Sequence, residues 1–145
     1  MNSTQRIESV NCNQLQSIKQ IADQSFSKRW TEKDFAYFLA HQNGLCIGGY
    51  EGEMLVAYFL GLLVQGDLDV ISIAVDPIAR RKGWGEKLLR EALSAQSVER
   101  SFLEVDSENG AAIALYQKLG FAISGKRKGY YQGIKDAILM HRQKK

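Results

Sequence analysis

The chain lacks the residues and runs that several classes of protein require. Its 145 residues include only two cysteines and two histidines, so neither a disulfide framework nor the ligand spacing of a zinc site is present. No apolar run approaches the roughly 20 residues of a membrane-spanning helix, and the N-terminal residues lack the apolar core of a secretory signal. With a single proline, no linker divides the chain. We therefore expect one domain over residues 1–145, located in the cytoplasm, with no metal and no membrane partner.

The charge of the chain is nearly balanced, with a formal net charge of +3 at pH 7. Basic residues gather at Arg80–Lys82, at Lys126–Lys128 and at Lys144–Lys145. No helix interleaves such residues with base-reading side chains, so we expect no nucleic-acid partner. The first cluster borders two glycines, and a polyanionic cofactor explains it more economically, whereas solvated loops explain the other two. The sequence indicates no oligomeric state.

The segment from Ile73 to Gly85 carries the strongest signal in the chain. A β-branched apolar run ends at Asp76–Pro77 and is followed by a basic turn and by Gly83-Trp84-Gly85. Apolar residues at helical spacing then continue to Leu93, which predicts a strand, a loop and the start of a helix. The N-terminus of a helix exposes unpaired N–H groups with partial positive charge, and glycines let a phosphate approach the backbone. The pattern therefore predicts a pyrophosphate site.

Two common pyrophosphate motifs are absent from this segment. A P-loop requires Gly-Lys-Ser/Thr, which the chain lacks, and a dinucleotide-binding fingerprint requires a third glycine where Leu88 stands. The structural alternative for Gly83-Trp84-Gly85 is a glycine turn that caps an ordinary helix.

The periodicity along the rest of the chain predicts a mixed order of helices and strands. Thr31 has the pattern of a helix N-cap, with Asp34 completing a capping box, and Asn109 has the pattern of a cap before the last helix. An antiparallel meander precedes one β-α-β crossover and a final hairpin, which predicts an α/β (α+β) fold with a mixed sheet. The expected strands cover residues 6–10, 45–50, 54–64, 68–75, 101–105, 121–124 and 137–141, and the expected helices cover 15–26, 31–42, 83–96 and 109–119.

Two blocks of the sequence resemble the GNAT superfamily of N-acetyltransferases. Arg80-x-x-Gly83-x-Gly85 resembles its (Gln/Arg)-x-x-Gly-x-(Gly/Ala) signature, which holds the pyrophosphate of coenzyme A. The stretch from Leu103 to Phe121, Leu-Glu-Val-x-x-x-Asn-x-x-Ala-Ile-x-Leu-Tyr-x-x-Leu-Gly-Phe, resembles its second block. Shorter matches resemble, within that superfamily, the bacterial ribosomal-protein-alanine N-acetyltransferases (RimI type): Ile73–Pro77, Trp30–Phe35, Tyr130–Tyr131 and Asp136–Met140. The likeness covers almost the whole chain.

The resemblance implies a fold, a co-substrate and a set of site residues. The fold is the GNAT acyl-CoA N-acyltransferase fold, a mixed, mostly antiparallel sheet with flanking helices, in which two central parallel strands splay apart around the pantetheine arm. The implied co-substrate is acetyl-CoA, with no metal. The implied cofactor-binding residues are Ile73, Ala74 and Val75 beside the thioester, where a backbone N–H polarises the acetyl carbonyl, then Arg81, Lys82, Gly83, Trp84, Gly85 and Glu86 around the pyrophosphate, and Asn109 on the pantetheine arm. The implied catalytic pair is Glu104 as general base and Tyr116 as general acid.

The chemistry of amine acetylation suits these residue types. An α-amino group with a pKa near 8 is mostly protonated at pH 7, so a carboxylate such as Glu104 can remove its proton, directly or through water. A tyrosine of ordinary pKa, about 10, protonates a thiolate of about 8.5 only against a difference of about 2 kcal/mol. Tyr116 therefore acts either as an acid or only as a hydrogen-bond donor to the sulfur. No covalent enzyme intermediate is required, so Cys12 and Cys46 receive no role.

Each of these residues also has a purely structural interpretation. Glu104, in an otherwise apolar strand, also fits a strand-end carboxylate that faces solvent, and Tyr116 fits a core position by its helical spacing. Asn109 serves equally well as a helix cap. Trp84 is bulky for a position between two glycines, and it either covers the adenine or packs outward.

The sequence leaves three functions open. The first is acetyl transfer to the N-terminal α-amino group of a protein, a ribosomal-protein alanine, and the second is acetylation of a small-molecule amine on the same fold. The third, a coenzyme-A-binding module without catalysis, is disfavoured by the presence of Glu104 and Tyr116. The stretch between Tyr131 and Asp136 is shorter than the family's loop and belongs to the hairpin that borders the acceptor groove. The resemblance therefore constrains the acceptor less than the co-substrate.

Overall fold

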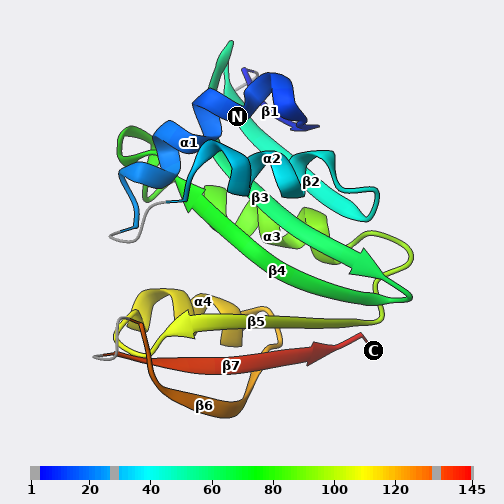
Figure 1. Ribbon diagram of the computed structural model, residues 1–145, viewed down its shortest axis with the longest axis vertical. Coiled ribbons are helices and arrows are strands. Elements are labelled where there is room, and N and C mark those ends of the chain that lie inside the picture. The colour runs from blue at the N-terminus through cyan, green and yellow to red at the C-terminus, as the bar shows by residue number, and fades with distance from the viewer. Residues whose placement is uncertain (1–3, 27–29, 132–134, 145) are drawn as a thin grey trace.

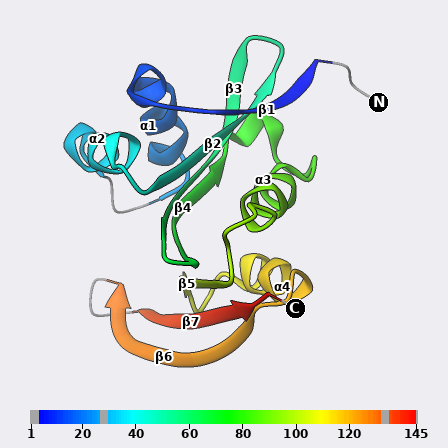
Figure 2. The same cartoon turned by 90° about the vertical axis from the view of Figure 1, so that its right-hand side faces the viewer.

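The computed structural model describes residues 4–26, 30–131 and 135–144; residues 132–134 of the shortened loop lie outside these ranges. In the described part, the strands form one sheet of seven in the order β1-β2-β3-β4-β5-β7-β6, with helices on both faces (Figure 1; Figure 2). The expected mixed α/β fold is confirmed. The strands are β1 (Gln5–Ser9), β2 (Gly44–Glu51), β3 (Met54–Val64), β4 (Asp67–Val75), β5 (Arg100–Asp106), β6 (Ala122–Tyr131) and β7 (Lys135–Gln143). The helices are α1 (Leu15–Asp23), α2 (Glu32–Ala40), α3 (Trp84–Leu93) and α4 (Gly110–Lys118), with short 3-10 turns at Cys12–Gln14 and Pro77–Ala79.

The central strand β3 has the bounds that the sequence predicts, residues 54–64. It pairs antiparallel with both β2 and β4, and helices cover both of its faces, which explains its continuous apolar run. Tyr58 and Leu60 pack with the buried residues of α1 and α2, whereas Phe59 packs with those of α3. Alternation along one strand thus assigns one hydrophobic cluster to each face of the sheet.

Several elements differ in length from their predictions, β6 most of all. β6 was expected to end at residue 124 but extends to Tyr131, because its pairing with β7 continues, with register shifts, through a basic run that contains glycine. α1 and α3 end earlier, at Asp23 and Leu93. In each case a serine just beyond the helix, Ser25 or Ser94, donates its hydroxyl to a carbonyl of the last turn and competes with the backbone there. No helix in the described ranges is long and apolar enough to cross a lipid bilayer.

The central parallel strands β4 and β5 are paired over only three rows, as the splayed sheet requires. Asp67–Asp69 pairs with Arg100–Phe102, and β4 then continues to Val75 with β3 as its partner. Within β4, Ile71 is an extra residue, because Leu60 pairs with Ser72 and the next residue of β3 pairs with Val70. Such a bulge bends a strand and increases its twist. The two strands therefore diverge towards the end of β4 at which α3 begins.

The first turn of α2 is closed by a reciprocal cap that can be tested for its contribution to stability. Thr31 Oγ1 accepts a hydrogen bond from the Asp34 N–H (3.3 Å), and Asp34 Oδ2 accepts one from the Thr31 N–H (2.7 Å). We expect Thr31→Ala to lower the free energy of unfolding by about 1 kcal/mol, measured by urea denaturation, and Thr31→Ser to retain most of it. Equal stability of the alanine variant and the unmodified protein would contradict this role of the cap.

Candidate active site

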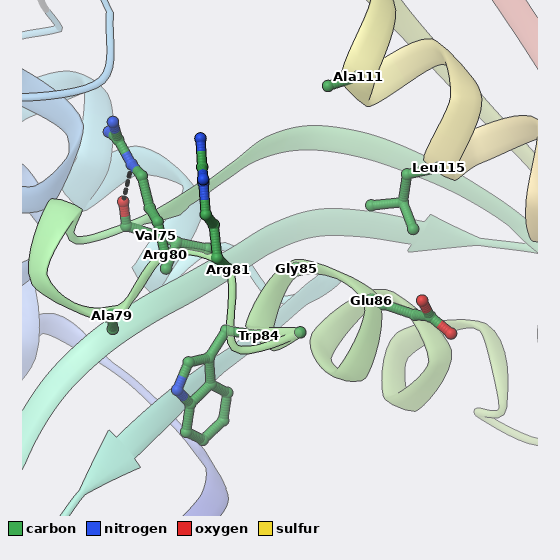
Figure 3. Close-up of a pocket in the computed structure, with 10 residues that line it drawn as sticks. Val75, Ala79, Arg80, Arg81, Trp84, Gly85, Glu86, Ala111 and Leu115 are labelled. Atoms are coloured by element: carbon green, nitrogen blue, oxygen red, sulfur yellow. Dashed lines mark hydrogen bonds between the residues drawn. The ribbon is translucent and has the colours of Figure 1, made fainter.

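A cleft of about 380 Å³ opens where β4 ends and α3 begins (Figure 3). One wall is the loop between these elements together with the first turn of α3, and the other wall is α4. The cleft therefore lies on the α3/α4 side of the sheet, beside the splayed strands. Its lining residues are Val75, Ala79, Arg80, Arg81, Gly83, Trp84, Gly85, Glu86, Ala111 and Leu115.

The loop presents uncapped backbone to this cleft. Gly83 is the N-cap of α3 in the left-handed conformation (φ +81°), and no side chain caps the helix there, whereas Thr31 and Asn109 cap α2 and α4. A methyl group added at Gly83 would meet nothing within 4 Å, and one added at Gly85 would meet only a leucine side chain at 3.8 Å. Open space thus lies beside the two glycines, at a helix start whose N–H groups no side chain caps. This geometry suits an anion as large as a phosphate.

The two arginines that precede the glycines have different surroundings. Arg80 donates from Nε to the carbonyl of Val75 (3.1 Å) and from Nη2 to Ser25 Oγ (3.2 Å), so it ties the end of β4 to the segment after α1. Arg81 lies in the left-handed region (φ +66°) and extends on the side of the loop where Ala111 lies (Figure 3). Arg81 thus adds a cation to the wall of the cleft.

The side chains of Lys82 and Glu86, both expected around the pyrophosphate, have protein partners instead. Lys82 Nζ lies 3.3 Å from Glu51 Oε1. Glu86 accepts hydrogen bonds from Lys118 Nζ (3.0 Å) and Arg90 Nε (2.9 Å). These two cations hold the pKa of Glu86 below its usual value, and the hydrogen bond from Lys118 has the larger effect. Glu86 therefore joins α3 to α4, and only its backbone N–H is suited to an anion.

The expectation that Trp84 covers the adenine or packs outward is wrong. Its side chain is 2% exposed and points away from the side of the loop that carries the arginines (Figure 3). The indole packs against Gly49 of β2, where a glycine leaves room for it. Only the backbone of Trp84 faces the cleft.

The end of β4 directs backbone groups into the gap between the splayed strands. The Asp76 N–H donates to the carbonyl of Val56 on β3 (2.7 Å), so the N–H and carbonyl of Val75 point to the opposite edge of β4, by the alternation of an antiparallel pair. The carbonyl accepts from Arg80, as described above. The backbone N–H and carbonyl of Ile73 have the same orientation as those of Val75. The side chain of Ala74, between them, is buried among residues of α1 and α2. The backbone N–H groups of Ile73 and Val75 thus face the gap.

Glu104 lies on the opposite face of the sheet from the cleft. Its neighbours Leu103 and Val105 are buried in the α3/α4 cluster, so Glu104 projects towards the side on which α1 and α2 pack. It is two residues beyond Phe102, the last residue of β5 that pairs with β4, and it therefore borders the gap. Its carboxylate Oε1 lies 2.9 Å from Nη2 of Arg127 on β6. The gap thus has the uncapped N-terminus of α3 on one face and a carboxylate on the other.

Asn109 directly precedes α4 and Tyr116 lies on it, and each has the structural role that its sequence position allows, a helix cap and a core residue. Asn109 caps the helix by accepting from the Ala112 N–H (3.2 Å). The Tyr116 side chain is 8% exposed, and its ring meets the Phe121 ring at an angle of 61° with 5.9 Å between centroids. Their roles towards a co-substrate are taken up below as proposals.

Four of the lining residues have no role implied by the family resemblance: Ala79, Arg80, Ala111 and Leu115. Ala111 and Leu115 are four residues apart and so share one face of α4. Their spacing beside the buried face of that helix was a usable signal. Arg80 stood in the quoted signature but carried no assigned role.

No metal site or reactive thiol is evident beside this cleft. In the described ranges no group of three or more histidine, cysteine, aspartate or glutamate side chains is placed to hold a metal ion. Cys12 is exposed, and burial raises the pKa of Cys46 to about 11, which leaves its thiol protonated at neutral pH.

Comparison with known proteins identifies the class of this site. The sequence profile of the Acetyltransferase (GNAT) family matches residues 15–121. The chain is 33% identical over 132 residues to the ribosomal protein bS18-alanine N-acetyltransferase of Salmonella typhimurium, covering 87% of this chain and 88% of that protein. It is 32% identical over 142 residues to the N-alpha-acetyltransferase RimI of Mycobacterium tuberculosis, covering 94% and 87%. The crystal structure of the ribosomal-protein-S18-alanine N-acetyltransferase from Escherichia coli matches with a TM-score of 0.90 at 30% identity, covering 96% of this chain and 93% of that one.

The chain therefore belongs to the GNAT family of acetyltransferases. It is an N-acetyltransferase, and the resemblance to the RimI type that the sequence blocks indicate is confirmed.

The open space before Gly85 provides a test of the anion site. We expect Gly85→Val to weaken acetyl-CoA binding by about tenfold or more, because its branched side chain would occupy the space in front of the loop N–H groups. Isothermal titration calorimetry measures the dissociation constant.

Gly85→Ala is the matched control, because the family signature accepts alanine at this position and alanine favours a helix more than glycine does. Near-normal affinity is expected for that variant. If the valine variant also bound acetyl-CoA normally while retaining its melting temperature, the loop would not be the pyrophosphate site.

Proposed function

We propose that this protein transfers the acetyl group of acetyl-CoA to the N-terminal α-amino group of a protein. The observation that carries the proposal is the gap between β4 and β5, which has an uncapped helix N-terminus on one face and Glu104 on the other. Two substrates can enter such a gap from opposite faces and meet within it. This arrangement supports direct transfer without a covalent enzyme intermediate.

The loop before α3 supplies the proposed pyrophosphate site. The N–H groups of the first turn from Gly83 to Glu86 donate to the phosphate oxygens, and Arg81 adds the opposing charge. Lys82 and the Trp84 side chain act from behind the loop, since both have partners there. Asn109, at the start of α4, borders the path of the pantetheine arm and combines this contact with its role as a cap.

The proposed reaction begins with a proton transfer. Glu104 accepts a proton from the acceptor ammonium, directly or through water, and the neutral nitrogen attacks the thioester carbon. The C–N bond forms as the carbonyl π-electrons move onto oxygen, and the N–H of Val75 donates to the developing oxyanion. Collapse of the tetrahedral intermediate breaks the C–S bond. The nitrogen loses its second proton to solvent, and the thiolate receives its proton from Tyr116 or from solvent.

The acceptor that we propose is the N-terminal alanine of a ribosomal protein, encountered in the cytoplasm. The names of the Salmonella and Escherichia relatives specify that acceptor, and the matches to them extend over most of both chains. Acetylation of a small-molecule amine on the same fold is the second candidate.

An acceptor assay tests the proposal. Release of the free thiol of coenzyme A is measured with an Ala-initiated peptide whose next residues are arginine and aromatic, so that its only amine is the α-amino group. A panel of small primary amines is measured in parallel. We expect turnover with the peptide and little with the small amines.

The same peptide with its α-amino group already acetylated is the control and should give no release. Turnover of a small amine alone would retain acetyl transfer but contradict a protein acceptor.

The general-base role of Glu104 predicts a specific dependence on pH. We expect Glu104→Gln to lower kcat by about 100-fold near pH 7. The deficit should shrink as the pH rises towards the pKa of the acceptor amine, about 8, because the amine then arrives neutral. A deficit that is constant across this range would assign Glu104 to binding or structure instead.

A further inference from the structure

The indole of Trp84 is enclosed on the side of the loop that faces away from the cleft. A methyl group built at Gly49 of β2 would lie 2.5 Å from Cζ3 and 2.6 Å from Cε3 of the ring, so only glycine at that position leaves room for the indole. The Trp84 Nε1–H donates to Glu51 Oε2 (2.8 Å), and Lys87 Nζ lies 5.1 Å from the ring centroid. The fit specifies both the position and the orientation of the indole.

Glu51, at the end of β2, binds the loop at two points. Its Oε2 accepts from Trp84, and its Oε1 lies 3.3 Å from Lys82 Nζ. These two residues flank Gly83, the turning point of the loop. The hydrogen bond from Trp84, and after it the contacts of Lys82, hold the pKa of Glu51 below its usual value. Glu51 therefore acts as an anion that fixes both sides of the turn.

The loop has few other attachments near its glycines. Gly83 has no side chain and lies in the left-handed region, and Gly85 has only one neighbouring side chain near the position of a β-carbon. Glycine in such a segment has a large conformational entropy in the absence of constraints. A loop that must be ordered upon binding loses affinity by the cost of that ordering, and a loop that is already ordered does not.

We propose that Trp84, Gly49 and Glu51 form an anchor that holds the loop before α3 in the conformation that binds the pyrophosphate of acetyl-CoA. The anchor residues are positioning residues, because they act from behind the loop. This inference rests on the proposed function, since it requires acetyl-CoA as the ligand. It assigns a role to the residue between the two glycines of the signature and to two residues of a strand more than 30 positions earlier.

The test compares acetyl-CoA with S-acetylpantetheine, an acetyl thioester that lacks the pyrophosphate and the 3′-phosphoadenosine attached to it. Glu51→Gln retains an oxygen that can accept from the indole N–H but loses the charge that faces Lys82. Trp84→Phe retains an aromatic ring that can pack against Gly49 but loses the N–H donor. We expect each to raise the dissociation constant of acetyl-CoA about fivefold or more, measured by calorimetry. S-acetylpantetheine lacks the pyrophosphate, and its inhibition constant in competition with acetyl-CoA should be unchanged in both variants.

Glu8→Gln is the control, because Glu8 is also a strand carboxylate paired with a cation, Arg6, but does not contact the loop. It should bind both thioesters like the unmodified protein, and melting temperatures verify that all variants are folded. An equal loss for both thioesters would mean a general structural role, and unchanged acetyl-CoA affinity would mean no role, so either result would overturn the anchor alone. Absence of acetyl-CoA binding by the unmodified protein would instead overturn the proposed function and the anchor with it.

Discussion

Pairing between β4 and β5 stops after three rows, and the rest of the site depends on that limit. A parallel pair that remained closed as far as Val75 would use the N–H groups of Ile73 and Val75 inside the sheet and would separate its two faces. The open pair leaves those groups available to a ligand and joins the faces through a gap. The sheet tolerates the opening because β4 keeps β3, and β5 keeps β7, as an antiparallel partner over most of its length.

The alternation of side chains along the two separated strands then gives each face its chemistry. Leu103 and Val105 are buried towards α3 and α4, so Glu104 projects to the other face. The loop that follows β4 turns towards α3 and places its uncapped N–H groups on the first face. In the proposed reaction, a polyanionic donor and a protonated amine are therefore received on different faces. The sheet would then keep the phosphates apart from the carboxylate that is proposed to accept the proton.

Features that depend on neighbouring residues could be predicted from the sequence, and features that depend on distant residues could not. The bounds of β3, the cap at Thr31 and the glycine turn are local, and the structure has each of them. The inward orientation of Trp84 depends on a glycine and a carboxylate of β2, more than 30 residues earlier in the chain. The contact of Glu104 with Arg127 depends likewise on the register of the last hairpin. The roles of the site residues in catalysis stay predictions.

As the proposed pyrophosphate site, the loop before α3 must satisfy two physical requirements that oppose each other. It must be free of side chains where the phosphates approach, which favours glycine, and it must be ordered before they arrive, which glycine opposes. A residue between two glycines can satisfy both, because its backbone faces the ligand while its side chain faces the protein. The indole of Trp84 does so here only because β2 has a glycine at residue 49. The sizes of the side chains at 49 and 84 therefore constrain each other, and a larger residue at 49 is compatible with this loop only if the residue at 84 is smaller.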